Sequence, residues 1–159
     1  MPGESERDNA VPGYLDQTLA TLRFGSAVPN WCFDRRLSAT GGAKYWRAKL
    51  RPLTDVVGWD AVAEGVAWLE FLPYHSLTYK SVPELVPSQR FTFGRLRQAM
   101  TRLVPVVALR GLTQWTTAVP ELAAYQHLVT ARNPRASSVS PGNLGEDGFA
   151  RVVRALAGS

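Results

Sequence analysis

The sequence predicts an α/β protein, a three-layer sandwich with a short, mainly parallel central sheet flanked by helices. Apolar runs with the character of buried strands occur at residues 66–72, 106–109 and 127–130. Segments with helical spacing of apolar residues separate them. Strands that alternate with helices favour right-handed βαβ crossovers, and therefore a parallel sheet. The 159 residues, 45% hydrophobic and 19% charged, suit one folded core.

Helices are expected on both sides of these strands. Leu15, Leu19 and Leu22 recur at spacings of four and three, which predicts a short first helix with these leucines on one face. The later helices are expected after Gly42, with Tyr45, Trp46, Leu50 and Leu53 inward; at 60–65; after Ser88, the expected N-cap; at 113–125, interrupted by Pro120; and at 148–156.

The chain is expected to form a mobile tail over residues 1–10 and a single α/β domain over residues 11–159. Cys32 is the single cysteine, so no internal disulfide is expected and a reducing bacterial cytoplasm fits best. With only two histidines, His75 and His127, no metal site is expected, and no cofactor motif is found. No apolar run approaches the roughly 20 residues that cross a bilayer, so no membrane partner is expected.

The net charge of +5 is unevenly distributed. Two stretches free of acids carry the basic residues Arg35, Arg36, Lys44, Arg47, Lys49 and Arg51, and then Arg90, Arg95, Arg97, Arg102 and Arg110. Such stretches attract phosphates, and they are equally typical of solvated helix faces. The charge pattern therefore leaves nucleic-acid contact open.

Ligands of open α/β sheets bind beyond the carboxyl ends of the strands, which selects three segments here. Tyr74, His75 and Ser76 follow the first strand, where His75 suits acid–base chemistry and Tyr74 suits stacking on a base. The others suit phosphate contacts: Arg110 after the second strand, and Arg135, Ser138, Ser140 and Asn143 after the third. A structured turn at 73–76, an Arg110–Glu70 ion pair and an ordinary polar loop are the alternatives.

The order of these segments resembles the uracil-DNA glycosylase superfamily. Pro12-Gly13 is similar to the end of its first-motif turn, residues 106–111 to its apolar strand and turn, and Asn133-Pro134 with the following serines to its His-Pro-Ser-Pro-Ser segment. The resemblance implies a flipped base that stacks on Tyr14 or Tyr74 and is released by hydrolysis, with phosphate held by Arg135, Ser138 and Ser140. Val11 stands where the turn has Asn, and Asn133 stands where the last motif has His.

The first hypothesis is therefore a nucleic-acid-directed or nucleotide-directed protein of glycosylase-like fold, with His75 and Asn133 as candidate catalytic residues. The second is a non-catalytic protein-interaction module on a degenerate α/β scaffold, anchored by Trp31, Trp46 and Trp59. A small-molecule hydrolase using His75 lacks a recognisable nucleophile. An unpaired sheet edge would allow a homodimer.

Overall fold

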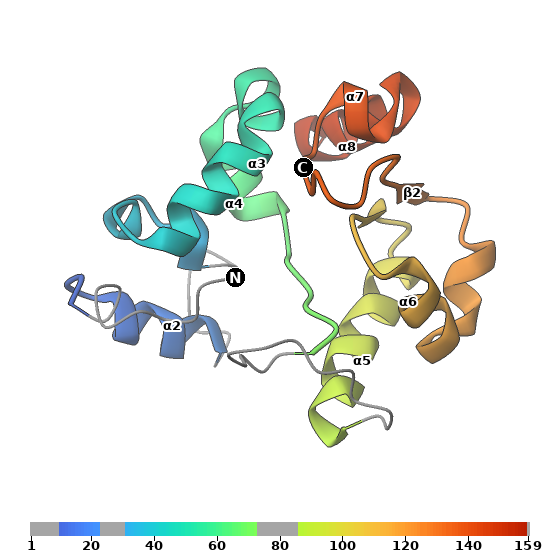
Figure 1. The fold of residues 1–159 in the computed structure, drawn as a ribbon, viewed down its shortest axis with the longest axis horizontal. Coiled ribbons are helices and arrows are strands. Elements are labelled where there is room, and N and C mark those ends of the chain that lie inside the picture. The colour runs from blue at the N-terminus through green and yellow to red at the C-terminus, as the bar shows by residue number, and fades with distance from the viewer. Residues whose placement is uncertain (1–9, 23–30, 73–85, 159) are drawn as a thin grey trace. The chain divides into compact units, whose positions relative to one another are not determined.

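The computed structural model describes residues 10–22, 31–72 and 86–158, and it combines helices with a two-stranded parallel sheet (Figure 1). The chain divides into two compact units. The first unit comprises Met1–Trp68, Ser138–Ser140 and Leu156–Ser159, and the second comprises Leu69–Ser137 and Pro141–Ala155. The single domain over residues 11–159 stays a prediction, and most of the expected tail lies outside the described residues.

The first unit is helical in its described part. Its elements are α2 (Tyr14–Leu22), η1 (Trp31–Phe33), η2 (Arg35–Leu37), α3 (Gly41–Val57) and α4 (Trp59–Gly65). The long helix α3 contacts both α4 and η1. As predicted, α3 buries Trp46, Leu50 and Leu53, whereas Tyr45 is only partly buried. The predicted helix at 60–65 is α4.

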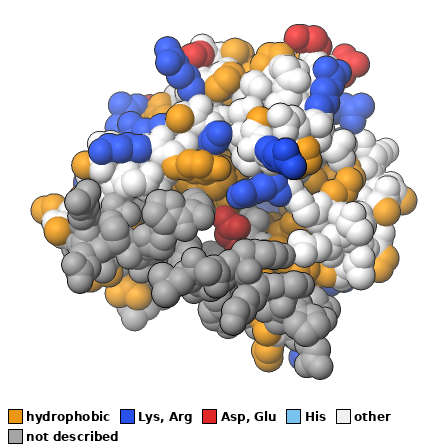
Figure 2. Space-filling view, viewed as in Figure 1, with side chains coloured by type: hydrophobic (Ala, Val, Ile, Leu, Met, Phe, Trp, Pro, Cys, Tyr) orange, Lys and Arg blue, Asp and Glu red, His pale blue; other side chains and the backbone are white. Residues whose placement is uncertain are grey.

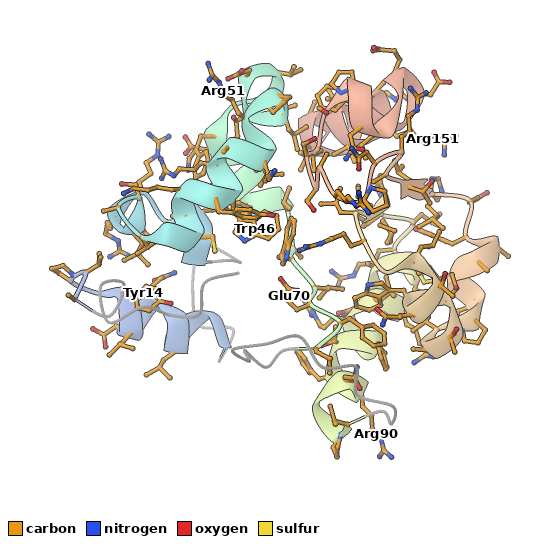
Figure 3. All side chains as sticks on the ribbon, viewed as in Figure 1. Tyr14, Trp46, Arg51, Glu70, Arg90 and Arg151 are labelled. Carbon is orange, nitrogen blue, oxygen red and sulfur yellow. The ribbon has the colours of Figure 1, made fainter. Side chains whose placement is uncertain are left out.

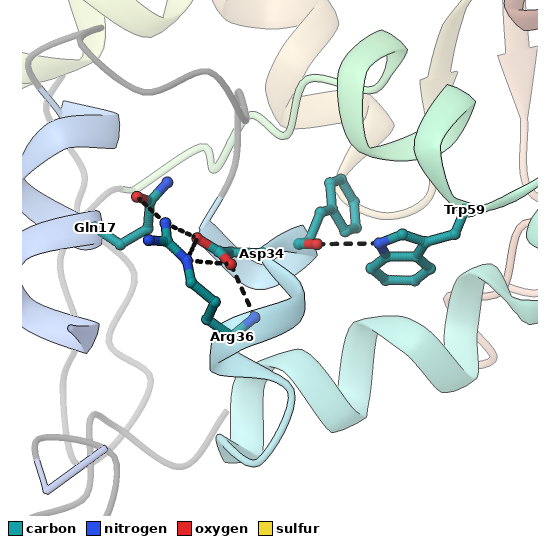
Figure 4. Close-up of polar contacts among 5 residues, drawn as sticks. Gln17, Asp34, Arg36 and Trp59 are labelled. Atoms are coloured by element: carbon teal, nitrogen blue, oxygen red, sulfur yellow. Dashed lines mark hydrogen bonds and ion pairs between the residues drawn. The ribbon is translucent and has the colours of Figure 1, made fainter. Parts of the chain in front are cut away.

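Two buried polar side chains set the path of the chain into α3. The Thr40 hydroxyl accepts a hydrogen bond from the Ala43 amide at 3.2 Å and donates one to the Leu37 carbonyl at 2.8 Å. Asp34 accepts from the Arg36 amide at 2.9 Å and pairs with the Arg36 guanidinium at 2.6 Å (Figure 4). Both side chains therefore supply acceptors to amides that have no helical partner of their own.

The first helix forms where it is expected, but Leu15 and Leu19 are not on its buried face. Leu15 and Leu19 are 53% and 47% exposed, and the buried side chain of α2 is Tyr14, at 1%. The α2 helix contacts η1, so the neighbour that is available to the helix decides which of its faces is covered. The spacing of the leucines predicted the helix correctly, but it does not say which face of the helix is buried.

The second unit holds the sheet. Its elements are α5 (Pro87–Thr101), β1 (Val106–Ala108), α6 (Leu112–Ala118), η3 (Pro120–Ala124), β2 (Leu128–Thr130), α7 (Pro141–Leu144) and most of α8 (Glu146–Ala157). The two strands pair in parallel, with Val107 opposite Val129. The structure confirms the predicted strands at 106–109 and near 127–130, the helix interrupted at Pro120 and the C-terminal helix.

A small apolar core lies between α5, α6 and η3. Its buried members are Phe93, Leu96, Val119 and Leu122. Aromatic rings extend this core, because Phe71 meets Trp115 edge-on with ring centroids 5.2 Å apart and Phe93 meets Trp115 at 5.9 Å. Trp115 therefore packs against the core of this unit.

The strand expected at 66–72 does not form in the described residues. Val66 caps the end of α4, and the residues after it trace an extended segment with no paired strand (Figure 1). The apolar side chains of this segment serve two different cores: Trp68 packs on Trp46, whereas Leu69 and Phe71 pack on the core of the second unit. A continuous apolar run predicts burial, but it does not by itself predict strand pairing.

The helix predicted after Ser88 begins two residues earlier than expected. Its N-cap is Val86, so Ser88 lies inside α5 and does not cap it. The capping contact comes from Gln89, whose buried side-chain oxygen accepts from the Val86 amide at 2.8 Å and whose nitrogen donates to the Phe71 carbonyl at 2.7 Å. The glutamine ties the helix start to the segment before it.

Candidate nucleic-acid interface

The parallel pairing brings two arginines to one edge of the sheet. Ala108 and Thr130 are opposite each other at the carboxyl ends of β1 and β2. Arg110 and Arg132 each follow two residues later, and both are exposed. Because the carboxyl ends of paired parallel strands lie together, the backbones of the two arginines leave the same edge of the sheet, and the Arg132 guanidinium lies against Gly145.

Gly111 shapes the turn that follows β1. Its backbone has φ 65° and ψ 27°, the left-handed conformation that glycine adopts without steric cost, and it precedes the first residue of α6. The turn lets the chain reverse immediately after Arg110. The position of Arg110 at the sheet edge is thus set by a strand on one side and a glycine turn on the other.

The loop after β2 is ordered by its own side chains. The Asn143 side-chain oxygen accepts from the Asn133 amide at 2.8 Å, and the Asn143 carbonyl accepts from the Arg132 amide at 2.7 Å. The Asn133 side-chain oxygen accepts from the Arg135 amide at 3.0 Å, which closes a tight turn. Asn143 is buried and therefore positions the loop, whereas Asn133 and Arg135 are exposed and accessible to a ligand.

The residues predicted to bind phosphate after the third strand are divided between the two units. Ser138 and Ser140 belong to the first unit, where their hydroxyls lie 3.4 Å apart and the Val139 amide between them donates to the Lys49 carbonyl at 3.0 Å. Asn133 and Arg135 belong to the second unit. The structure therefore groups Arg110, Asn133, Arg135 and Asn143 in one unit and does not bring the serines into that group.

The predicted aromatic and histidine positions fall elsewhere. Tyr74, His75 and Ser76 lie outside the described residues. Tyr14 lies on α2 in the first unit (Figure 3), and at 1% exposure its ring offers no free face for stacking. His127 is partly buried, with its ring edge-on to Tyr125 at a centroid distance of 5.6 Å.

Acids are scarce in the stretch of sequence that contains the sheet. Between Glu84 and Glu146 the sequence holds seven arginines and one acid, Glu121. Glu121 hydrogen-bonds to Arg97, and that bond lowers the pKa of its carboxyl group. Figure 2 shows Lys and Arg side chains on the visible face, with some Asp and Glu side chains among them. Glu146 and Asp147 directly follow Gly145, which the Arg132 guanidinium approaches.

The tryptophans expected as partner anchors are mostly occupied. Trp46 is a buried residue of α3 (Figure 3). Trp59 is partly buried, its indole N–H donates to the Phe33 carbonyl at 3.1 Å, and the Arg47 guanidinium lies 4.3 Å from its ring centre. The Trp31 side chain is outside the described set. Burial also lowers the pKa of Arg47, whose Nε and Nη2 have no hydrogen-bond partner in the described structure.

A scan against protein-family models finds no match for this chain, and comparisons with curated proteins and with solved structures find no significant match. The fold and the site define a mixed helix–sheet protein with arginines at the carboxyl ends of its two paired strands. None of the described helices has both the length and the apolar character needed to cross a membrane. Within the same described residues, no cluster of three His, Cys, Asp or Glu side chains could hold a metal ion.

Sequence reasoning did not place Arg132 beside Arg110. The signal was available, since each arginine lies at the same distance from the end of an apolar strand. Only the register of the strands turns that equal spacing into proximity.

Proposed function

We propose that this protein binds nucleic acid or a nucleotide through the arginines at the carboxyl edge of β1 and β2. The observation that carries the proposal is the parallel register, which brings exposed Arg110 and Arg132 to one edge, with Arg135 in the following turn. Guanidinium groups form charge-assisted, often bidentate, hydrogen bonds with phosphate oxygens. The ordered loop after β2 holds the backbone of Arg135 in place, which lowers the entropic cost of that contact.

A glycosylase-like three-layer architecture with hydrolysis of an N-glycosidic bond is the finer part of this proposal. Asn133 supports it, because the side-chain oxygen is used within the turn while the amide N–H groups of an exposed residue are available to a base edge. His75 would act as the acid or base toward water or the leaving base, so that water adds to the sugar carbon as the base departs. Cys32 is the single cysteine of the sequence and is buried, which suits the reducing cytoplasm that we propose as the compartment.

Binding to short single-stranded and double-stranded DNA over a salt series tests the first part. We expect affinity to fall as salt rises, and Arg135→Ala and Arg110→Ala each to weaken binding and reduce the salt slope by about one unit. Arg51→Ala is the matched control, because it removes the same charge from an exposed position on α3, outside the second unit (Figure 3). Equal effects from all three variants would mean that only total charge matters, and the proposed interface would be wrong.

A base-release assay on uracil-containing single-stranded DNA tests the second part. We expect release by the wild-type protein, with loss in His75→Ala and a smaller loss in Asn133→Ala. DNA binding without any base release would retain the interface and reject the hydrolase.

The alternative remains a protein-interaction module, and one observation favours it. Leu15 and Leu19 lie one turn apart on α2 and are both about half exposed, an arrangement typical of a helix that docks on a partner. The described sheet has only β1 and β2, so each strand has an open edge on which a second copy of the chain could pair. Sedimentation of the wild-type protein tests whether two copies associate, and sedimentation of Leu15→Ser/Leu19→Ser tests whether α2 makes the contact between them. A wild-type dimer that the variant abolishes, together with no DNA binding at any salt, would favour this alternative.

A further inference from the structure

A cavity of about 690 Å³ opens at the amino edge of the sheet, at the opposite end of the strands from the arginines discussed above. It is lined by Leu103, Pro105, Gln126, His127, Arg151, Arg154 and Ala155. The first four precede β1 and β2, and the last three come from α8, which supplies the Arg151 labelled in Figure 3. All seven lining residues belong to the second unit, so one compact body forms the whole cavity.

The polar part of the lining is basic. Arg151 and Arg154 are three positions apart on α8, so their side chains leave the same face of the helix. Arg151 donates to the Gln126 carbonyl at 3.2 Å, which holds its guanidinium at the wall, and the His127 imidazole adds a further nitrogen donor or acceptor. No acid lines this cavity. Arg154 also lies in the last turn of α8, where positive charge stabilises a helix even without a ligand. A loss of stability on its substitution would therefore not show ligand binding, which has to be measured directly.

The apolar part of the lining contains Leu103, whose backbone conformation and whose exposure to solvent are both unfavourable for a leucine. Leu103 follows the end of α5 with φ 57°, a left-handed conformation in which glycine is preferred because a Cβ crowds the following carbonyl. Its amide donates to the Met100 carbonyl at 3.0 Å, and the Val104 amide donates to the Ala99 carbonyl at 3.1 Å, the pattern that ends many helices. The leucine side chain is also 58% exposed, so folding of the described chain does not offset its strain by burial. An apolar group bound in the cavity would cover it.

We propose that this cavity binds a phosphate monoester that carries an apolar or aromatic body. The phosphate is held by Arg151 and Arg154, with His127 completing the basic wall, and the body lies on Leu103 and Pro105. A phosphate dianion matches two guanidinium groups better than a singly charged carboxylate does. The hollow is shallow and open to solvent, and its volume is within the range of small-molecule sites. The proposal does not depend on nucleic-acid binding at the other edge.

Calorimetric titration of the full chain with phenyl phosphate tests it, with inorganic phosphate, phenol and benzoate as comparison ligands. We expect saturable binding of phenyl phosphate that is at least tenfold tighter than that of each comparison ligand. Arg154→Gln is expected to weaken it at least tenfold, whereas Arg90→Gln, which removes the same charge from an exposed position in the first turn of α5, leaves it unchanged. Leu103→Gly is expected to weaken binding severalfold without lowering the thermal midpoint, because it removes the apolar surface and relieves the strained backbone.

Each failure has a distinct meaning. Absence of saturable phenyl phosphate binding, or an unchanged dissociation constant in Arg154→Gln, overturns the site. Inorganic phosphate or phenol that binds as tightly as phenyl phosphate overturns the two-part ligand, and tighter benzoate overturns the phosphate. Loss of DNA binding in Arg110→Ala with intact phenyl phosphate binding would separate this site from the proposed interface.

Discussion

Two helical glycines of the second unit should respond oppositely to the same substitution. Gly148 is in the first turns of α8, and a Cβ built there would lie 2.8 Å from Val129 Cγ1 and 3.5 Å from Leu144 Cβ. Gly94 is inside α5, and a Cβ there meets nothing within 4 Å. We therefore expect Gly148→Ala to destabilise this unit and Gly94→Ala to stabilise it.

The magnitudes follow from the two environments. Relief of the Gly148 contact needs a shift of roughly 1 Å toward ordinary carbon–carbon separation, and Val129 cannot yield readily because it is buried, β-branched and paired in β2. Overpacking of this kind costs about 1–3 kcal/mol, from which better helix propensity recovers up to about 1 kcal/mol. Gly94→Ala meets no such clash and should gain about 0.5–1 kcal/mol. The two variants should therefore differ by about 2 kcal/mol.

Urea unfolding followed by circular dichroism measures both variants against the wild type. A double-mutant cycle with Val129→Ala sharpens the test, because that background removes the clashing methyl group. In it, Gly148→Ala should become neutral or stabilising, although Val129→Ala is itself destabilising. A Gly148→Ala protein as stable as the wild type would refute the close packing of α8 on β2.

Three further predictions concern buried polar groups. Thr40→Ala should destabilise the first unit by about 1 kcal/mol through loss of the helix cap, while Thr40→Ser restores most of it, as measured by urea unfolding. The hydrogen bonds from Arg36 lower the pKa of Asp34 below its ordinary value of about 4, so its stabilising effect is complete above pH 4 and is lost as the pH falls through the lowered pKa. The stability gap between the wild type and Asp34→Asn, measured in denaturant from pH 7 down to pH 2, should therefore shrink below pH 4, and a constant gap would contradict the assignment. Gln89→Glu should cost about 1–3 kcal/mol in urea unfolding at pH 7, because a carboxylate cannot donate to the Phe71 carbonyl; an unchanged midpoint would count against that bond.

Much of the secondary structure followed from local patterns. Pro120 interrupts a helical run and separates α6 from η3, and the alternation of apolar runs with helical segments anticipated the parallel pairing of β1 and β2. The three-layer sandwich and the glycosylase likeness remain proposals. The strand expected at 66–72 was wrong because its apolar character reflects side-chain burial in two cores rather than a backbone ladder.

The site was only partly accessible from the sequence. Arg110, Asn133 and Arg135 could be proposed from the sequence because strand ends and polar loops are local features. Tyr14 was misjudged as a stacking surface, since burial depends on the neighbour that covers a helix. The amino-edge cavity was missed because its lining comes from three segments, 103–105, 126–127 and 151–155, that no short-range pattern connects.

The sequence by itself predicted most of the helices and both observed strands, showed that acids are scarce between Glu84 and Glu146, and showed which arginines follow the strands. Those features arise from periodicity, turn chemistry and composition, which act over a few residues. Only the tertiary structure shows that Arg110 and Arg132 follow paired strand ends and that Tyr14 is buried while Leu15 is exposed. It also shows that Leu103 and Arg154 line the same hollow. Register and burial depend on contacts between residues distant in the chain, and the free energy of those contacts is not encoded in any single segment.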